Sequence, residues 1–148
     1  MRLANRWVWG FIALVVITLL VYWPGMQGGF YFDDESNIID PPGIHWQQIN
    51  VASWRGLIEE SLIPGRPVSN LSFALNHLFW GLDPQPYHWT NLLIHLLAGL
   101  VLWRMFGQYL KIHVNHKYHS SGWLALMGTA IFLLHPLNIQ AVDQKSVV

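Results

Sequence analysis

Residues 7–23 read WVWGFIALVVITLLVYW, a run of 17 residues without a charged side chain. A helix of about 20 predominantly apolar residues is needed to cross the hydrocarbon core of a bilayer. Aromatic residues stand at both ends of the run: Trp7, Trp9, Tyr22 and Trp23. Amphipathic aromatic rings favour the lipid–water boundary. We therefore expect a transmembrane helix over residues 7–23.

The same run also resembles the apolar part of a secretory signal peptide, because Arg2 and Arg6 precede it. However, no Ala-x-Ala-like cleavage site follows, and the next residues are Pro24, Gly25 and Met26. A retained helix is therefore favoured over a cleaved signal.

The composition agrees with a membrane protein. Hydrophobic residues make up 53% of the 148 residues and charged residues only 11%, whereas a soluble domain has about 25% charged residues. The net charge of zero excludes a basic nucleic-acid-binding protein, so no nucleic acid is expected as a partner. The absence of cysteine excludes a disulfide framework and a cysteine nucleophile.

Two further apolar segments are candidates for spans, which makes the chain one membrane unit over 1–148. The expected order is a first span at 7–23, an outer loop at 24–87, a second span at 88–106, a cytoplasmic loop at 107–120, a third span at 121–142 and the start of a second outer loop at 143–148. Pro136 falls near the end of the third span.

The charges predict the orientation of these spans. Arg and Lys occur without acidic residues in the segments 1–6 and 104–122, whereas most acidic residues lie in the loop 24–87. Lys and Arg concentrate on the cytoplasmic side of membranes. We therefore expect a cytoplasmic amino terminus and a long acidic loop on the outer side. The compact loops and the absence of cysteine favour the bacterial inner membrane over the endoplasmic reticulum.

The outer loop is expected to form two helices, at about 50–63 and 67–80, because its apolar residues recur at helical spacing. Asn50 is a suitable N-cap for the first helix, and Gly81 ends the second. The loop is rich in tryptophan, which suits helices lying on the membrane surface; a small soluble subdomain is the alternative. The predicted fold is an all-α integral membrane protein with three transmembrane helices and amphipathic surface-lying helices in a long first outer loop.

An acidic segment, GGFYFDDESNI at residues 28–38, begins this loop. Its three consecutive carboxylates are Asp33, Asp34 and Glu35. They fit a solvated acidic turn, or alternatively a general base or a cation site beside a water-filled cavity. A carboxylate near a medium of low dielectric constant becomes a better base. Paired carboxylates also bind divalent cations through their oxygens, so Asp33 and Asp34 are candidate ligands for one.

Polar residues recur at the outer ends of the second and third spans. His88, Asn91 and His95 are spaced so that they share one helix face, and His135 precedes Pro136. Ionisable groups inside spans usually face a bundle interior or a cavity, although hydrogen bonds between helices also explain them. In the loop, Arg66 fits a phosphate group or pairing with a loop carboxylate.

Three segments in this order resemble one family. They are FYFDDESNI, GRPVSNLSFALNHLFWGLDPQPYHWTNLLIHLL and LLHPLNIQAV. Together they resemble the amino-terminal part of the GT-C membrane glycosyltransferases. The resemblance is closest to the O-mannosyltransferase-like group whose animal members carry tetratricopeptide repeats (the TMTC type), and to its bacterial relatives.

The resemblance implies transfer of a sugar from a polyprenyl-phosphate carrier to an acceptor hydroxyl, on a protein or a glycan, outside the cytoplasm. Asp34 or Asp33 would take the proton from that hydroxyl, with inversion at the anomeric carbon. The neighbouring aspartate and Glu35 would orient the acceptor or hold a divalent cation. Arg66 would stabilise the departing phosphate. The remaining polar residues would line the cavity: His88, Asn91, His95 and His135.

The sequence also departs from the family, whose members continue through many further spans. It ends at Val148, so we expect a fragment, a truncated product or one part of a split enzyme, inactive alone. In the last case the remaining part of the enzyme would be a partner, beside the lipid bilayer. The alternative function is a non-catalytic membrane subunit or remnant that binds a partner through its outer-loop helices.

Overall fold

The computed structural model describes residues 2–30, 34–59, 67–113 and 121–138, and within these ranges it consists of helices and turns without a strand. The all-helical class is therefore confirmed. The elements in chain order are α1 (Arg2–Tyr22), a 3₁₀ turn (Trp23–Gln27), a π-helical turn (Glu35–Ile39), a 3₁₀ turn (Pro42–Ile44), α2 (Val51–Glu59), α3 (Pro67–Trp80), α4 (Pro84–His113), α5 (Ser121–Leu134) and a 3₁₀ turn (Pro136–Asn138).

The chain divides into two compact units. The bundle unit consists of residues 1–24 and 91–142, and it holds α1, most of α4, and α5. The loop unit consists of residues 25–90 with 143–148, and it holds the acidic segment, α2, α3 and the first turns of α4.

Two helical stretches are long and apolar enough to cross a membrane, by length and composition: Arg6–Gln27 and Pro84–His113. The second is longer than the span expected over 88–106. A third span is not confirmed. The 14 residues of α5 rise only about 21 Å at 1.5 Å per residue, which is less than the roughly 30 Å of the hydrocarbon core.

The end of α5 explains why this helix is short. The span expected over 121–142 continues past Pro136, but α5 ends at Leu134. Proline lacks the amide N–H that a helix interior needs, and it disfavours a helical conformation of the residue before it. A short 3₁₀ turn follows, and residues 139–142 lie outside the described part of the chain.

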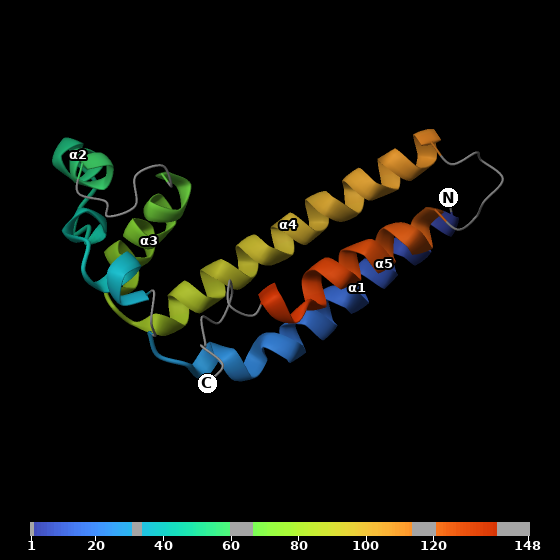
Figure 1. The fold of residues 1–148 in the computed structure, drawn as a ribbon, viewed down its shortest axis with the longest axis horizontal. Helices are drawn as coiled ribbons and strands as arrows, with labels where there is room; N and C mark the ends of the chain where they lie inside the picture. Colours follow the sequence, from blue (N-terminus) through green and yellow to red (C-terminus); the bar gives the residue numbers. More distant parts are fainter. Residues whose placement is uncertain (1, 31–33, 60–66, 114–120, 139–148) are drawn as a thin grey trace. The chain divides into compact units, whose positions relative to one another are not determined.

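Glycines allow the three helices of the bundle unit to approach closely. A Cβ atom added at any of four glycines would lie 2.5–2.7 Å from a side chain of a facing helix. The facing pairs are Gly10 with Leu126, Gly122 with Trp7, Gly99 with Leu133, and Gly128 with Phe106. Helix α5 therefore packs on α1, beside which it runs (Figure 1), and also on α4. Small residues at such contacts are typical of helices packed in membranes.

Two buried hydroxyl groups in the bundle unit are satisfied within their own helices. The side chains of Thr18 and Thr129 are 0% exposed. Their hydroxyls donate hydrogen bonds to the carbonyls four residues earlier, Leu14 at 2.9 Å and Ala125 at 2.8 Å. Because these hydrogen bonds are made locally, the hydroxyls can be buried without the penalty of an unpaired polar group.

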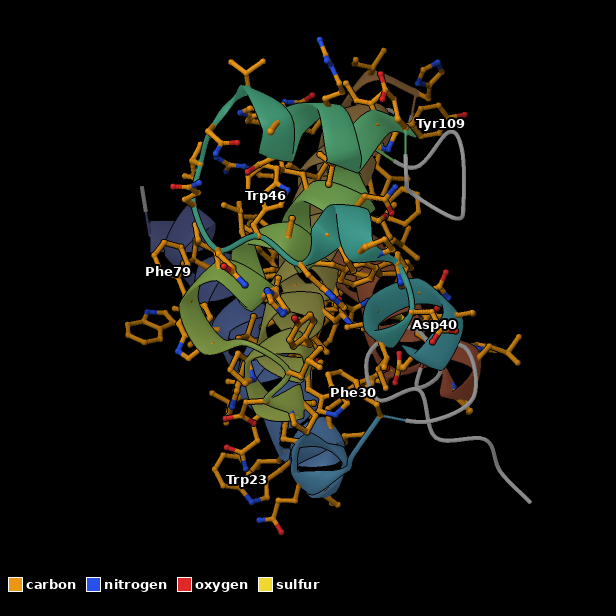
Figure 2. The ribbon with its side chains drawn as sticks, turned by 90° about the vertical axis from the view of Figure 1, so that its left-hand side faces the viewer. Trp23, Phe30, Asp40, Trp46, Phe79 and Tyr109 are labelled. Carbon is orange, nitrogen blue, oxygen red and sulfur yellow. The ribbon has the colours of Figure 1, made fainter. Side chains whose placement is uncertain are left out.

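The loop unit has its own hydrophobic core, and Trp46 joins α2 to it. The buried residues are Ile38, Ile44, Trp46, Leu57, Ala74 and Tyr87. The indole N–H of Trp46 donates to the carbonyls of Gly43 at 3.2 Å and Ser53 at 3.1 Å. Figure 2 shows Trp46 beneath α2, whereas Phe79 lies at the edge of the unit and is 66% exposed.

Two predicted helix ends in the loop unit are confirmed. The side-chain oxygen of Asn50 accepts a hydrogen bond from the backbone N–H of Ser53 at 2.8 Å, as an N-cap does. Gly81 follows α3 with φ of +63°, and its N–H donates to the carbonyl of His77 at 2.8 Å. Glycine ends helices in this way because it adopts the left-handed conformation without a Cβ clash. Residues 60–63 of the first expected helix lie outside the described residues.

One face of α2 is apolar and exposed. Val51, Trp54 and Ile58 are 79%, 44% and 76% exposed. Their spacing of three and four residues places them on one side of the helix. That this side rests on a membrane surface stays a prediction.

We predict that Gly122→Val destabilises the bundle unit by about 1–3 kcal/mol, because the added atoms would overlap the Trp7 ring. The measurement is the thermal unfolding midpoint of the chain in detergent, followed by circular dichroism. Gly107→Val is the matched control, because a Cβ at Gly107 meets nothing within 4 Å. Equal midpoints for the two variants would contradict the packing of α5 on α1.

Candidate acidic site in the loop unit

The acidic segment contains a buried carboxylate. Asp34 is 2% exposed, and it directly precedes the π-helical turn Glu35–Ile39. Such turns are rare in proteins and frequently occur at functional sites. Asp33 lies outside the described residues, and of Glu35 only the backbone is described. Among the predicted acidic residues, Asp34 is therefore the one whose surroundings can be followed.

The end of this segment is anchored in the core of the loop unit. Ile38 is 1% exposed and belongs to the hydrophobic core. The carbonyl of Ile38 accepts a hydrogen bond from Nε2 of His45 at 2.8 Å. Because a carbonyl can only accept, Nε2 of His45 carries a proton. The backbone four residues after Asp34 is thus held by both packing and a hydrogen bond.

The beginning of the segment is anchored by the first turns of α4. His88 is 3% exposed, and its Nε2 donates to the carbonyl of Gly28 at 3.2 Å. Phe30 packs edge-on against Tyr87, with ring centroids 5.3 Å apart. The predicted site residue His88 therefore fixes the backbone ahead of the carboxylates.

Burial of Asp34 between these two anchors limits what the carboxylate can do. Aspartate is almost never fully buried unless it is paired. A carboxylate shielded from bulk water and held in place matches the requirement for a general base, which must meet its proton donor at hydrogen-bonding distance. A freely solvated acidic turn does not fit the 2% exposure of Asp34.

The predicted polar residues of the bundle unit contact the end of α5. Nε2 of His95 donates to the carbonyl of Leu133 at 3.2 Å, and the hydroxyl of Tyr22 donates to the same oxygen at 3.3 Å. Nδ1 of His135 accepts the backbone N–H of Leu137 at 3.2 Å. The last carbonyls of a helix lack partners within the helix, and His95 and Tyr22 satisfy one of them, that of Leu133.

The predicted site residues therefore fall into three groups. The loop unit holds Asp34, Glu35 and His88. The bundle unit holds Asn91, His95 and His135. Of these, Asn91 is half-buried and His135 is exposed. Asp33 and Arg66 lie outside the described residues. Within the described residues, no group of three or more His, Asp or Glu side chains could hold a metal ion.

Sequence reasoning missed two polar features of the loop unit. His45 and His77 stack with ring centroids 4.5 Å apart, and Nδ1 of His77 donates to the carbonyl of Trp46 at 3.2 Å. Asn76 is 3% exposed and accepts a hydrogen bond from the hydroxyl of Thr90 at 3.0 Å. The one available signal was the polar pair at 76–77 within the apolar sequence FALNHLFW.

The chain is thus all-helical in its described residues, has two helices long and apolar enough to cross a membrane, and carries an anchored acidic segment between them in the sequence. Comparison with known proteins confirms the resemblance predicted from the motifs. The chain is similar to protein O-mannosyl-transferases of the TMTC group. It is 28% identical to human TMTC3 over 88% of this chain. It is 29% identical to Drosophila melanogaster Tmtc3 over 89% of this chain, and 31% identical to Xenopus laevis tmtc2 over 84%.

The chain spans only about 15% of the length of these curated relatives. No protein-family model matches it, and no solved structure shows a significant match. The relatives come from animals, so they lend no support to the expectation of a bacterial inner membrane.

We predict that His88→Ala speeds hydrogen exchange of the backbone amides at residues 28–30. Losing one buried hydrogen bond of about 1 kcal/mol corresponds to about fivefold more frequent local opening. The measurement is hydrogen–deuterium exchange by mass spectrometry on the chain in detergent. His88→Gln, which keeps an N–H donor, is expected to recover part of the protection.

His113→Ala is the control for this experiment. His113 is exposed, its ring stacks on Tyr109 of the same helix, and its Nδ1 donates to the carbonyl of Tyr109 at 3.1 Å. Unchanged exchange at residues 28–30 in His88→Ala would show that this histidine does not anchor the acidic segment.

Proposed function

We propose that this chain supplies the acidic active-site segment of a GT-C type glycosyltransferase. The enzyme would transfer a sugar from a polyprenyl-phosphate carrier to an acceptor hydroxyl on the extracytoplasmic side of a membrane. One observation carries the proposal: Asp34 is buried on a segment anchored at both ends. The similarity to proteins named O-mannosyl-transferases supports mannose as the sugar and a protein as the acceptor.

The chemistry needs one base and no covalent intermediate. The oxygen of the acceptor hydroxyl forms a bond to the anomeric carbon, and the bond from that carbon to the phosphate oxygen breaks. The carboxylate of Asp34 takes the hydroxyl proton, and the carrier phosphate leaves with the bonding electron pair. A single displacement of this kind inverts the anomeric carbon. Asp33 is the alternative base, and Glu35 would orient the acceptor.

Charge that develops on the leaving phosphate requires a positive partner. We assign this role to Arg66, because a guanidinium group matches the oxygens of a phosphate in geometry and charge. A divalent cation at the acidic segment would serve the same purpose. That Asn91, His95 and His135 contribute to substrate binding stays a prediction.

The competing role is a non-catalytic membrane subunit that binds a partner protein. The observation that favours it is the exposed apolar face of α2, formed by Val51, Trp54 and Ile58. Such faces mark contacts with proteins or membranes. This role requires no base, so the two functions differ in how they depend on Asp34.

We predict that Asp34→Asn abolishes sugar transfer while membrane insertion is unchanged. Asparagine keeps the shape of the side chain and removes its ability to take a proton. The measurement uses membranes of the natural host that carry the chain, with radiolabelled polyprenyl-phosphate mannose as donor. The readout is label incorporated into protein and released by mild base, as expected for a sugar linked to Ser or Thr.

Asp40→Asn is the matched control, because Asp40 is an exposed aspartate of the same loop unit (Figure 2). It is expected to transfer sugar at the rate of the unchanged chain, and Asp33→Asn is compared with it to identify the base. Normal transfer by Asp34→Asn, Asp33→Asn and the double variant would contradict the enzymatic proposal and favour the subunit role.

A further inference from the structure

The loop unit contains a pocket of about 710 Å³ that none of the roles above uses. Its walls are the turn at residues 42–48 and one side of α2, and its lining residues all belong to the loop unit. The volume falls within the range of small-molecule sites, roughly 300–1,000 Å³. The pocket is therefore large enough for a ligand the size of a sugar.

The walls of the pocket are held by hydrogen bonds before any ligand arrives. The hydroxyl of Ser53 donates to the carbonyl of Gln48 at 2.7 Å, which fixes the turn to the start of α2. The ring of His45 is held by the carbonyl of Ile38 and by stacking on His77. A preformed site loses less conformational entropy when it binds a ligand.

The polar side chains of the lining offer donors and acceptors together. Gln47 and Gln48 are exposed amides, each with an N–H₂ donor and a carbonyl acceptor. Arg55 and Glu59 form a pair at 4.0 Å with side chains 72% and 66% exposed. At that distance and exposure, both groups can still hydrogen-bond to a ligand.

The charges of the pocket do not favour an anionic ligand over a neutral one. Arg55 and Glu59 are its charged lining residues, and their formal charges cancel. The amino end of α2 would otherwise favour an anion, but one of its backbone N–H groups, that of Ser53, already donates to the side-chain oxygen of Asn50. A neutral ligand with many hydroxyl groups fits this lining, because each hydroxyl both donates and accepts a hydrogen bond.

Gly56 lines the pocket on the side of α2. A glycine in a helix interior weakens the helix relative to alanine, and Gly56 is such a residue, at a position that lines the pocket. Gly56 contributes no side chain to the lining, so a larger residue at this position is expected to occupy part of the pocket.

We propose that this pocket is a binding subsite for one pyranose unit of a neutral sugar. The choice of a sugar over other polyhydroxylated ligands rests on the proposed function. The size and the neutral, hydroxyl-rich character of the ligand rest on the pocket. Asp34 does not line the pocket, so sugar binding is expected to persist in Asp34→Asn.

The test is ligand-observed saturation-transfer NMR with methyl α-D-mannopyranoside as the probe. The chain is kept in a phosphocholine detergent, because maltoside detergents carry sugar headgroups that would compete. We expect saturation transfer to the mannoside with the unchanged chain. Gly56→Leu, which fills the pocket, is expected to lose the signal, and Gly56→Ala, which favours the helix, is expected to weaken it.

Ile58→Ala is the control, since Ile58 lies on α2 outside the pocket and is 76% exposed. It is expected to keep the full signal, and circular dichroism checks the helix content of each variant. No signal with the unchanged chain, an equal signal in Gly56→Leu, or loss of signal in Ile58→Ala would overturn the proposal. Binding of an unstructured Ser/Thr-rich peptide in place of the mannoside would also overturn it. Because the readout is binding, these results do not depend on whether the chain transfers sugar.

Discussion

Two hydrogen bonds from histidine rings to backbone carbonyls hold the acidic segment in place, and the loop unit depends on them. His88 binds the carbonyl of Gly28 and His45 binds that of Ile38, on either side of the buried Asp34. Burying a carboxylate is costly unless it is paired or hydrogen-bonded, so the groups around it must be held in place. The core of the loop unit supplies this rigidity, because Ile38 packs within it and His45 stacks on His77 of α3. The position of the carboxylate is therefore a property of the fold and not of one short turn.

In the bundle unit the corresponding constraint is the end of α5. Pro136 stops this helix early, and the carbonyl of Leu133 would be left without a partner inside an apolar bundle. His95 and Tyr22 satisfy it from two other helices. This contact ties α1, α4 and α5 together at one level, and the glycine contacts between the helices make the close approach sterically feasible.

Sequence reasoning could predict what local rules determine. The apolar run at 7–23, the cap at Asn50 and the stop at Gly81 follow from composition, side-chain chemistry and backbone conformation within a few residues. The end of α5 at Leu134 was less accessible from the sequence, because the apolar run continues past Pro136, whereas the backbone rule for proline ends the helix before it.

The contacts within the candidate site were less accessible from sequence. Its spacing on one helix face with two other polar residues predicts His88 as a site residue. The carbonyl that His88 binds, that of Gly28, is 60 residues away in the sequence. His45 has no such spacing, and its roles come from partners that only the tertiary fold brings to it. The pocket beside α2 has the same origin, since a turn and a helix face make it together.

We propose that the acidic segment faces the outer side of a membrane, where a lipid-linked sugar would be transferred. The chain contains no cysteine, so single cysteines can report the side directly. Asp40→Cys lies just after the segment and is expected to react with a membrane-impermeant maleimide added to intact cells. Lys111→Cys, near the end of α4, is expected to react only after the membrane is permeabilised. Labelling of Asp40→Cys only after permeabilisation would contradict the account.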